Sequence, residues 1–162
     1  MREEIVIRKA LPADIPHIQN IALETWHDTY DDLIPREVQD KFLAEAYSDE
    51  RMPGRIERTS LFVAEENGEV VGFANFFFKN PQQAELGAVY IYPQAQGRKI
   101  GSRLLRAGIQ EKNSLEKIYV EVEKENYAGM AFYYAKGFEL LEEFEEELFG
   151  HKLQTTRMVL HL

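Results

Sequence analysis

The hydrophobic and polar positions of the chain change their period several times, and each change predicts a new element. Apolar and polar residues alternate in residues 117–123, KIYVEVE, which is the period of a half-buried strand. In residues 60–78 two β-rich runs flank Asn67 and Gly68, a dipeptide that strongly favours a hairpin turn. The remaining predicted strands are residues 5–8, 84–92, 138–148 and 155–162.

Helical spacing replaces this alternation in the segments between the strands. Ile15, Ile18, Ala22 and Trp26 recur near the helical period after a proline, which predicts a helix within residues 12–30. The other predicted helices are residues 35–47, 49–58, 98–114 and 126–137, the last with Asn126 as its N-cap and Gly137 just past its end. The order β-α-α-β-β-β-α-β-α-β-β predicts one mixed α/β domain over residues 1–162.

Composition narrows the class of protein. The net charge of −9 argues against nucleic acid as a partner and is compatible with a cationic one. The absence of cysteine excludes disulfides and thiolate ligands, and His17, His151 and His161 lack metal-ligand spacing, so no metal is expected. No segment is apolar enough for a signal peptide or a membrane span, which predicts a cytoplasmic protein without a membrane partner.

A short loop follows the strand predicted at residues 84–92 and leads into a helix. It contains Gly97 and Gly101 with Arg98 and Lys99 between them. The first amides of a helix have no partner within the helix and carry the positive end of its dipole, so this loop can bind an anion. Taken alone, the loop is better explained as a strand–helix turn that carries solubilising charges.

Two motifs resemble the signatures of the GCN5-related N-acetyltransferases. QGRKIG resembles the pyrophosphate-binding pattern Gln/Arg-x-x-Gly-x-Gly/Ala: Gln96 and Gly101 match, whereas Lys99 stands where the family usually has glycine. NYAGMAFYYAKGF resembles the pattern Asn-x-x-Ala-x-x-Phe-Tyr-x-x-x-Gly-Phe, in which Gly129 replaces the alanine. The residues that match this second pattern are Asn126, Phe132, Tyr133, Gly137 and Phe138.

This resemblance implies a fold and a co-substrate. The family's mostly antiparallel central sheet has six to seven strands flanked by helices, and its fourth and fifth strands splay apart. Acetyl-CoA enters that gap, and no metal takes part. Carried onto this chain, the amides of Val89 and Ile91 would face the acetyl and pantetheine groups. The residues that would face the phosphates are Gln96, Gly97, Arg98, Lys99, Gly101 and Ser102.

The resemblance also implies catalytic roles. Tyr133 matches the tyrosine that points at the sulfur, and Asn126 matches the asparagine that touches the cofactor arm, a role compatible with capping a helix. Glu85 lies eleven positions before Gln96, the spacing of the catalytic glutamate in the histone-acetylating branch. Period two would place Glu85 on the strand face of Val89 and Ile91, where apolar neighbours raise the pKa of a carboxylate toward that of a base. An exposed charge, or a water chain acting as the base, is the alternative.

The acceptor is expected to be a small amine. Two acidic segments, WHDTYDDL and LLEEFEEEL, fall where the family builds its acceptor cleft. The segment ETWHDTYDDLI and the ending of the chain resemble the bacterial polyamine acetyltransferases of the PaiA type. Spermidine or spermine is therefore expected. Residues assigned to the acceptor are Trp26, Tyr30, Asp31, Glu142 and Glu146. Strand spacing puts both glutamates in an apolar row, unless a bulge turns them away.

Several alternatives stay open at this stage. The acidic hairpin is equally compatible with a solvated sheet edge that discourages strand pairing. The acceptor could be another small amine, a protein N-terminus or a lysine. A non-catalytic sensor of acetyl-CoA could share the same motifs. The protein could be a homodimer or a monomer.

Overall fold

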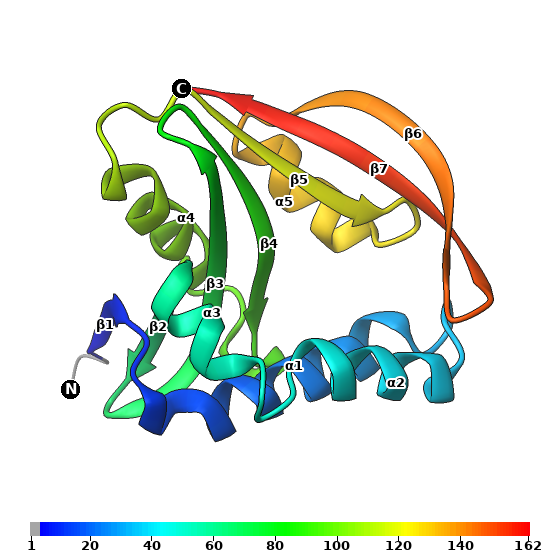
Figure 1. The fold of residues 1–162 in the computed structure, drawn as a ribbon, viewed down its shortest axis with the longest axis horizontal. Coiled ribbons are helices and arrows are strands. Elements are labelled where there is room, and N and C mark those ends of the chain that lie inside the picture. Colours follow the sequence, from blue (N-terminus) through cyan, green and yellow to red (C-terminus); the bar gives the residue numbers. More distant parts are fainter. Residues whose placement is uncertain (1–3) are drawn as a thin grey trace.

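The central sheet of the computed structural model, which describes residues 4–162, has the strand order β1-β2-β3-β4-β5-β7-β6 (Figure 1). All neighbouring strands are antiparallel except β4 and β5, which run parallel. This confirms the predicted mixed, mostly antiparallel sheet. The strands are β1 (Ile5–Lys9), β2 (Ser60–Glu66), β3 (Glu69–Asn80), β4 (Gln83–Ile91), β5 (Lys117–Glu123), β6 (Glu139–Leu148) and β7 (His151–His161).

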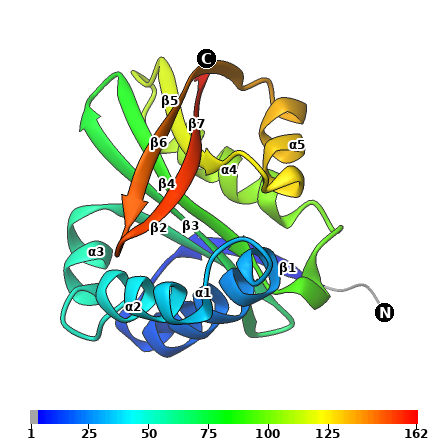
Figure 2. The same ribbon diagram turned by 90° about the vertical axis from the view of Figure 1, so that its right-hand side faces the viewer.

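Helices cover both faces of the sheet (Figure 2). α1 (Ile15–Tyr30), α2 (Arg36–Ala46) and α3 (Met52–Arg58) pack on one face, and α4 (Ile100–Glu111) and α5 (Tyr127–Ala135) pack on the other. Short 3-10 turns, Pro12–Asp14 and Pro93–Ala95, precede α1 and α4. No helix among residues 4–162 is long and apolar enough to cross a membrane.

Two hydrophobic cores lie on opposite sides of the sheet, and β3 contributes to both. Its side chains are buried almost continuously, with Phe73 in the core under α1 and Phe76 in the core under α4. The hairpin that joins β2 to β3 turns at Asn67 and Gly68, whose φ angles are 52° and 85°. Positive φ at both turn residues confirms the predicted hairpin and explains why this dipeptide occupies it.

The pairing between β4 and β5 is short. Only residues 83–86 pair with residues 117–120, and beyond them the two strands diverge. The predicted splay of the fourth and fifth strands is therefore present. It leaves one edge of β4 without a neighbouring strand from Gly87 onward.

A β-bulge at Gly87 changes which side chains face each core. Leu86 pairs with Phe76 and Ala88 pairs with the adjacent Asn75, so Gly87 has no partner on β3. A Cβ atom at Gly87 would lie 2.6 Å from the ring of Phe77, so the close packing of that ring requires glycine.

The bulge moves Glu85 to an unexpected face. Beyond it, Val89 and Ile91 pack on the α4 side, whereas Ala88 and Tyr90 pack on the α1 side. Glu85 belongs to the α1 side because alternation is interrupted at Gly87. The prediction that Glu85 shares a face with Val89 and Ile91 is wrong, since it assumed an unbroken period of two.

A second bulge shifts the alternation in β6. Leu140 pairs with Met158, and Glu142 pairs with the next residue of β7, Arg157. Glu142, Phe144 and Glu146 therefore lie on the same face as Arg157, opposite to Leu140. The apolar row predicted for the two glutamates breaks at this bulge.

The β6–β7 hairpin arches away from β5, and its turn comes down beside α1 and α2 (Figure 1). Leu148 and Leu153, which flank the turn, contact the core that contains those helices. β7 begins four residues before the predicted strand because it pairs with β6 as far as His151. The hairpin and the α1–α2 layer thus flank the face of the sheet that carries Glu85, Arg157 and Glu146.

Candidate active site

A cavity of about 470 Å³ follows the free edge of β4. Its walls come from α1, the end of β4, the loop before α4, the divergent part of β5, and α5. A volume of this size is typical of a site for a small molecule or a cofactor arm. The splay of the sheet therefore produces an elongated site that touches both helical layers.

The backbone of β4 points two amides into this cavity. The amide of Tyr92 donates to the Val71 carbonyl of β3, at 2.9 Å. Because successive amides of a strand point to opposite edges, those of Val89 and Ile91 point away from β3, toward the cavity. β5 no longer pairs with this part of β4, so a ligand can take the place of a neighbouring strand. The arrangement has the geometry expected for a pantetheine arm.

The loop before α4 keeps a glycine-like path without the usual glycine. Lys99 caps α4 with φ 62° and ψ 19°, the left-handed conformation that favours glycine. This explains the departure from the family signature, since the backbone course is preserved although the residue differs. It also explains why α4 begins at Ile100 and not at residue 98 as predicted. Four neighbouring loop residues line the cavity with Lys99: Gln96, Gly97, Gly101 and Ser102.

Two side chains of this loop have structural contacts. The Gln96 amide donates to the Ile91 carbonyl at 3.1 Å, which ties the loop to the end of β4. Arg98 pairs with Glu66 and does not line the cavity, so its predicted place beside the phosphates stays a prediction. A Cβ atom at Gly101 would lie 3.0 Å from the Phe132 ring, so the packing of α5 favours glycine there.

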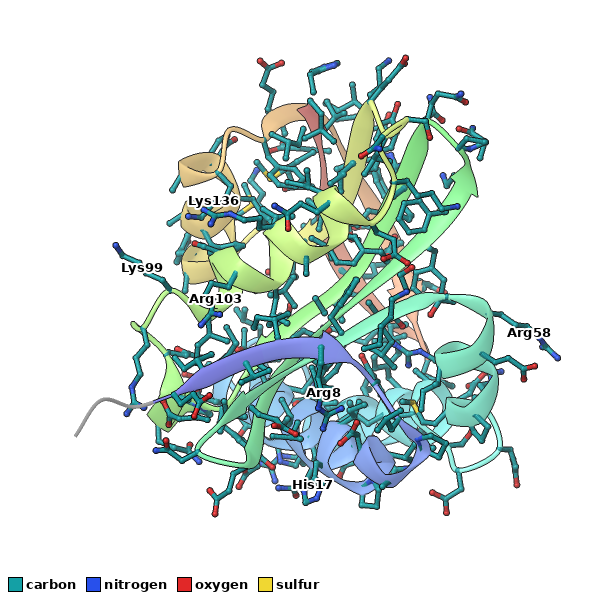
Figure 3. All side chains as sticks on the ribbon, turned by 90° about the vertical axis from the view of Figure 1, so that its left-hand side faces the viewer. Arg8, His17, Arg58, Lys99, Arg103 and Lys136 are labelled. Atoms are coloured by element: carbon teal, nitrogen blue, oxygen red, sulfur yellow. The ribbon has the colours of Figure 1, made fainter. Side chains whose placement is uncertain are left out.

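A further lysine borders the cavity. Lys136, at the end of α5, lines it and places its ammonium 5.7 Å from the centre of the Phe132 ring. Figure 3 shows Lys99 and Lys136 on the same side of the molecule. The sequence motifs did not single out Lys136, because its position in the second signature is variable.

Tyr133 lies in the wall of the cavity opposite β4. Its ring packs edge-on against Phe132 and Phe138, with centroids 5.3 and 5.2 Å away. Burial raises the pKa of the Tyr133 phenol well above its ordinary value, and the nearby Tyr30 adds to the effect. The hydroxyl therefore stays protonated at neutral pH and can donate a proton.

Asn126 caps α5, as predicted, and also reaches across the cavity. Its side-chain oxygen accepts a hydrogen bond from the Gly129 amide at 3.0 Å, and its nitrogen donates to the Tyr30 hydroxyl at 3.3 Å. Both Asn126 and Tyr30 line the cavity. Burial raises the pKa of Tyr30, so this phenol too is neutral.

The remaining predicted residues of α1 fall in different places. Trp26 lines the cavity, stacks on Phe42 and donates to the Tyr90 hydroxyl at 2.9 Å. Asp31 does not line it. The Arg36 guanidinium lies 2.6 Å from the Asp31 carboxylate and lowers its pKa, so Asp31 joins α1 to α2.

Glu85 is not part of the cavity lining, and it is paired with two cations. Its carboxylate lies 2.6 Å from Arg157 and 3.2 Å from Lys79. The apolar surroundings predicted for Glu85 are therefore replaced by an ion-pair network.

Within residues 4–162, Glu121 is the one carboxylate in the cavity lining. It accepts a hydrogen bond from Arg157 at 3.0 Å and keeps 42% of its side chain exposed. Glu121 is a polar member of an alternating strand, but periodicity alone does not show that this part of β5 diverges from β4. Here Glu121 lines the cavity on the face of the sheet that the β6–β7 hairpin and the α1–α2 layer flank.

The predicted acceptor residues Glu142 and Glu146 lie beside the cavity and not in its lining. Burial raises the pKa of Glu146, and the negative charge of Glu121 raises it further. Two carboxylates from different strands thus repel each other on one face. Among residues 4–162, no three His, Asp or Glu side chains form a group that could hold a metal ion.

Known proteins share both the motifs and the fold. The profile of the Acetyltransferase (GNAT) family matches residues 16–138. A spermidine N(1)-acetyltransferase from Thermoplasma acidophilum is 29% identical over 144 residues, which cover 84% of this chain and 89% of the relative. An L-amino acid N-acyltransferase from Escherichia coli, MnaT, is 30% identical over 110 residues, which cover 63% of this chain and 64% of the relative.

A solved structure extends the likeness to the whole chain. The PaiA N-acetyltransferase from Thermoplasma acidophilum, in complex with coenzyme A, superposes with a TM-score of 0.85 at 25% identity and covers 98% of this chain and 99% of its own. The free β4 amides and the loop before α4 fit such a cofactor. The chain therefore belongs to the acetyltransferase (GNAT) family and is an acetyl-CoA-dependent N-acetyltransferase.

Proposed function

We propose that the protein acetylates a small polyamine, spermidine or spermine. The observation that carries this proposal is a group of carboxylates on one face of the sheet, with Glu121 in the cavity lining and Glu146 beside it. Burial raises the pKa of Glu146, and the negative charge of Glu121 raises it further. A bound ammonium group between the two carboxylates would relieve this repulsion. The PaiA-like relatives support the same substrate class, since one of them is a spermidine N(1)-acetyltransferase.

The cofactor would be held by backbone groups along the cavity. The amides of Val89 and Ile91 would bind the pantetheine arm and the thioester oxygen. The amides of residues 96–102 would bind the phosphates at the start of α4. Acetyl-CoA supplies the activated acetyl group when bound, and these groups orient it toward α1.

Two side chains would move protons during the transfer. Glu121 would take the proton that the acceptor ammonium must lose before its nitrogen forms the new bond to the acetyl carbon. Tyr133 would donate a proton to the sulfur as the carbon–sulfur bond breaks, and its raised pKa keeps that proton available. Glu85 remains the alternative base predicted from the spacing of the sequence. Because Arg157 holds its carboxylate outside the cavity lining, Glu85 would take the proton through a water chain.

A second candidate acceptor is an amine that bears a carboxylate. A neighbouring hollow of about 620 Å³ shares Gly87 and Tyr90 with the cavity and is lined by Arg51, Arg55 and Arg58. Arg55 already binds Asn75 and the Ala46 carbonyl, and Arg51 lies 3.3 Å from the Glu45 carboxylate. Arg58 would then be the first cation to meet a carboxylate in this hollow. The likeness to an L-amino acid N-acyltransferase favours the same candidate.

A competition assay tests the proposal. Thiol release from acetyl-CoA is measured with equal concentrations of spermidine, spermine, butylamine, amino acids and a lysine peptide, at low and high salt. Spermidine or spermine is expected to react fastest and to show a KM that rises with salt, because attraction between exposed charges is screened. Preference for butylamine, an amino acid or the peptide at both salt concentrations would reject the polyamine.

A further inference from the structure

Three buried polar atoms have no hydrogen-bond partner among residues 4–162: Thr25 Oγ1, Gln39 Oε1 and Thr156 Oγ1. Of these three residues, Thr25 alone lines the active-site cavity. A buried hydroxyl without a partner destabilises a folded protein, so such groups are uncommon and call for a physical reason. A ligand that completes the hydrogen bond is one such reason.

The position of Thr25 within α1 makes the missing bond more informative. A helical threonine commonly bonds the carbonyl four residues earlier, but Thr25 Oγ1 has no such partner although only 8% of the residue is exposed. Thr29, one turn later on the same face of the helix, also lines the cavity. The wall of α1 thus offers hydroxyl groups between the aromatic rings of Trp26 and Tyr30.

The fold indicates which ligand this wall meets. α1 packs on the face of β4 that carries Ala88 and Tyr90. The loop before α4 and the side chains of Val89 and Ile91 lie toward the opposite face. Thr25 therefore approaches the cavity from the side opposite the phosphate-binding loop, where the acceptor would enter.

We propose that Thr25 is a substrate-binding residue for the acceptor amine. Its hydroxyl oxygen accepts a hydrogen bond from an N–H of the reacting nitrogen and holds that nitrogen while Glu121 receives its proton. A hydroxyl suits this task because it can accept from the nitrogen in both its ammonium and its neutral form. The inference rests on the proposed function and adds to it the residue that positions the nucleophile.

Thr25→Val tests the proposal, because valine keeps the shape of threonine and removes the hydroxyl. The apo-protein is expected to melt about 2–4 °C higher, since an unpaired buried polar group is lost. The KM for spermidine is expected to rise about 3- to 10-fold, with the Kd of acetyl-CoA unchanged. Thr25→Ser, which retains the hydroxyl, should recover a KM near that of the parent protein.

Thr156→Val is the matched control, because Thr156 is also buried and unpartnered but lies outside the cavity lining. It should raise the melting temperature and leave the KM unchanged. If Thr25→Val leaves the KM unchanged, or weakens acetyl-CoA instead, Thr25 does not bind the acceptor. If the parent protein acetylates neither spermidine nor butylamine, the proposed function itself fails, and the inference fails with it.

Discussion

The Tyr30 hydroxyl accepts a hydrogen bond from Asn126 across the gap between the two halves of the sheet, at 3.3 Å. Tyr30 ends α1, and Asn126 caps α5 on the opposite face, so this contact links the two helical layers beside the cavity. Both residues were predicted as ligand-binding residues. Their mutual contact adds a structural role to each.

Tyr30→Phe should therefore lower stability. Loss of one partly buried hydrogen bond costs about 1 kcal/mol, which corresponds to about 2–4 °C in melting temperature for a chain of this size. Tyr127→Phe is the control, because Tyr127 is 74% exposed. Equal melting temperatures for Tyr30→Phe and the parent protein would show that the hydrogen bond between Tyr30 and Asn126 does not contribute to stability.

Tyr133→Phe should reduce kcat by about 100-fold, the lower range for loss of a general acid, with little change in the Kd of acetyl-CoA. Because burial raises the pKa of Tyr133, activity in the parent protein should not fall on account of this residue as the pH reaches 10. Tyr134→Phe, a change in an exposed neighbour, should leave kcat unaltered. Steady-state kinetics across pH would test this role. An unchanged kcat in Tyr133→Phe would show that Tyr133 serves only in packing.

Glu121→Gln and Glu85→Gln distinguish the two candidate bases. Glu121→Gln should lower kcat by about 100-fold, because the group that accepts the proton is gone. Glu85→Gln should instead lower the free energy of unfolding by about 1–3 kcal/mol, since Arg157 and Lys79 lose a charged partner. The reverse pattern, with kcat lowered by Glu85→Gln alone, would return the base to Glu85.

Lys99→Gly should separate backbone strain from charge. Glycine relieves the left-handed conformation at φ 62° and should stabilise the protein by up to about 1 kcal/mol. Loss of the ammonium should weaken acetyl-CoA by about 2- to 5-fold at low salt and less at high salt. Calorimetry measures both quantities, and an unchanged Kd would mean that only backbone amides bind the phosphates.

Glu146→Gln should change stability in a pH-dependent way. The raised pKa of Glu146 means that the folded protein holds this proton more tightly than the unfolded chain. The parent protein therefore loses stability as the pH rises from the ordinary range of a glutamate through the raised value. Glu146→Gln should be slightly more stable above this window and equal to the parent protein below it.

The same substitution should raise the KM for spermidine by about 3- to 10-fold, because one of two carboxylates near the acceptor is lost. Glu147→Gln is the control, since strand alternation points Glu147 to the other face of β6. Identical kinetics in the two variants would identify the acidic hairpin as a solvated edge.

The order of elements and the loop before α4 could be predicted from the sequence because their signals are local. Asn67 and Gly68 specify their turn, Asn126 caps its own helix, and the loop signature lies within a few residues of the helix it begins. The divergence of β4 from β5 was predicted from the resemblance to the acetyltransferases. These features need little knowledge of distant contacts.

The placement of the acidic residues depended on distant contacts and was less predictable. Glu85 was assigned to the wrong face because the bulge at Gly87 is stabilised by the ring of Phe77 on another strand. Glu121 is not singled out by the sequence because its strand continues beyond its pairing with β4, where it lines the cavity. Neither effect leaves a periodic trace in the sequence.

Gly87 gives β4 one residue more than its pairing with β3 uses. Leu86 and Ala88 pair with the adjacent Phe76 and Asn75, so deleting Gly87 would leave both pairs in place and restore regular alternation. Tyr90 would still face α1, Ile91 would still face α4, and the edge amides of Val89 and Ile91 would be kept. A deletion after Ala88 would remove a paired residue and exchange the two faces of the strand beyond it. Related chains should therefore tolerate loss of the bulge residue more readily than loss of Val89 or Tyr90.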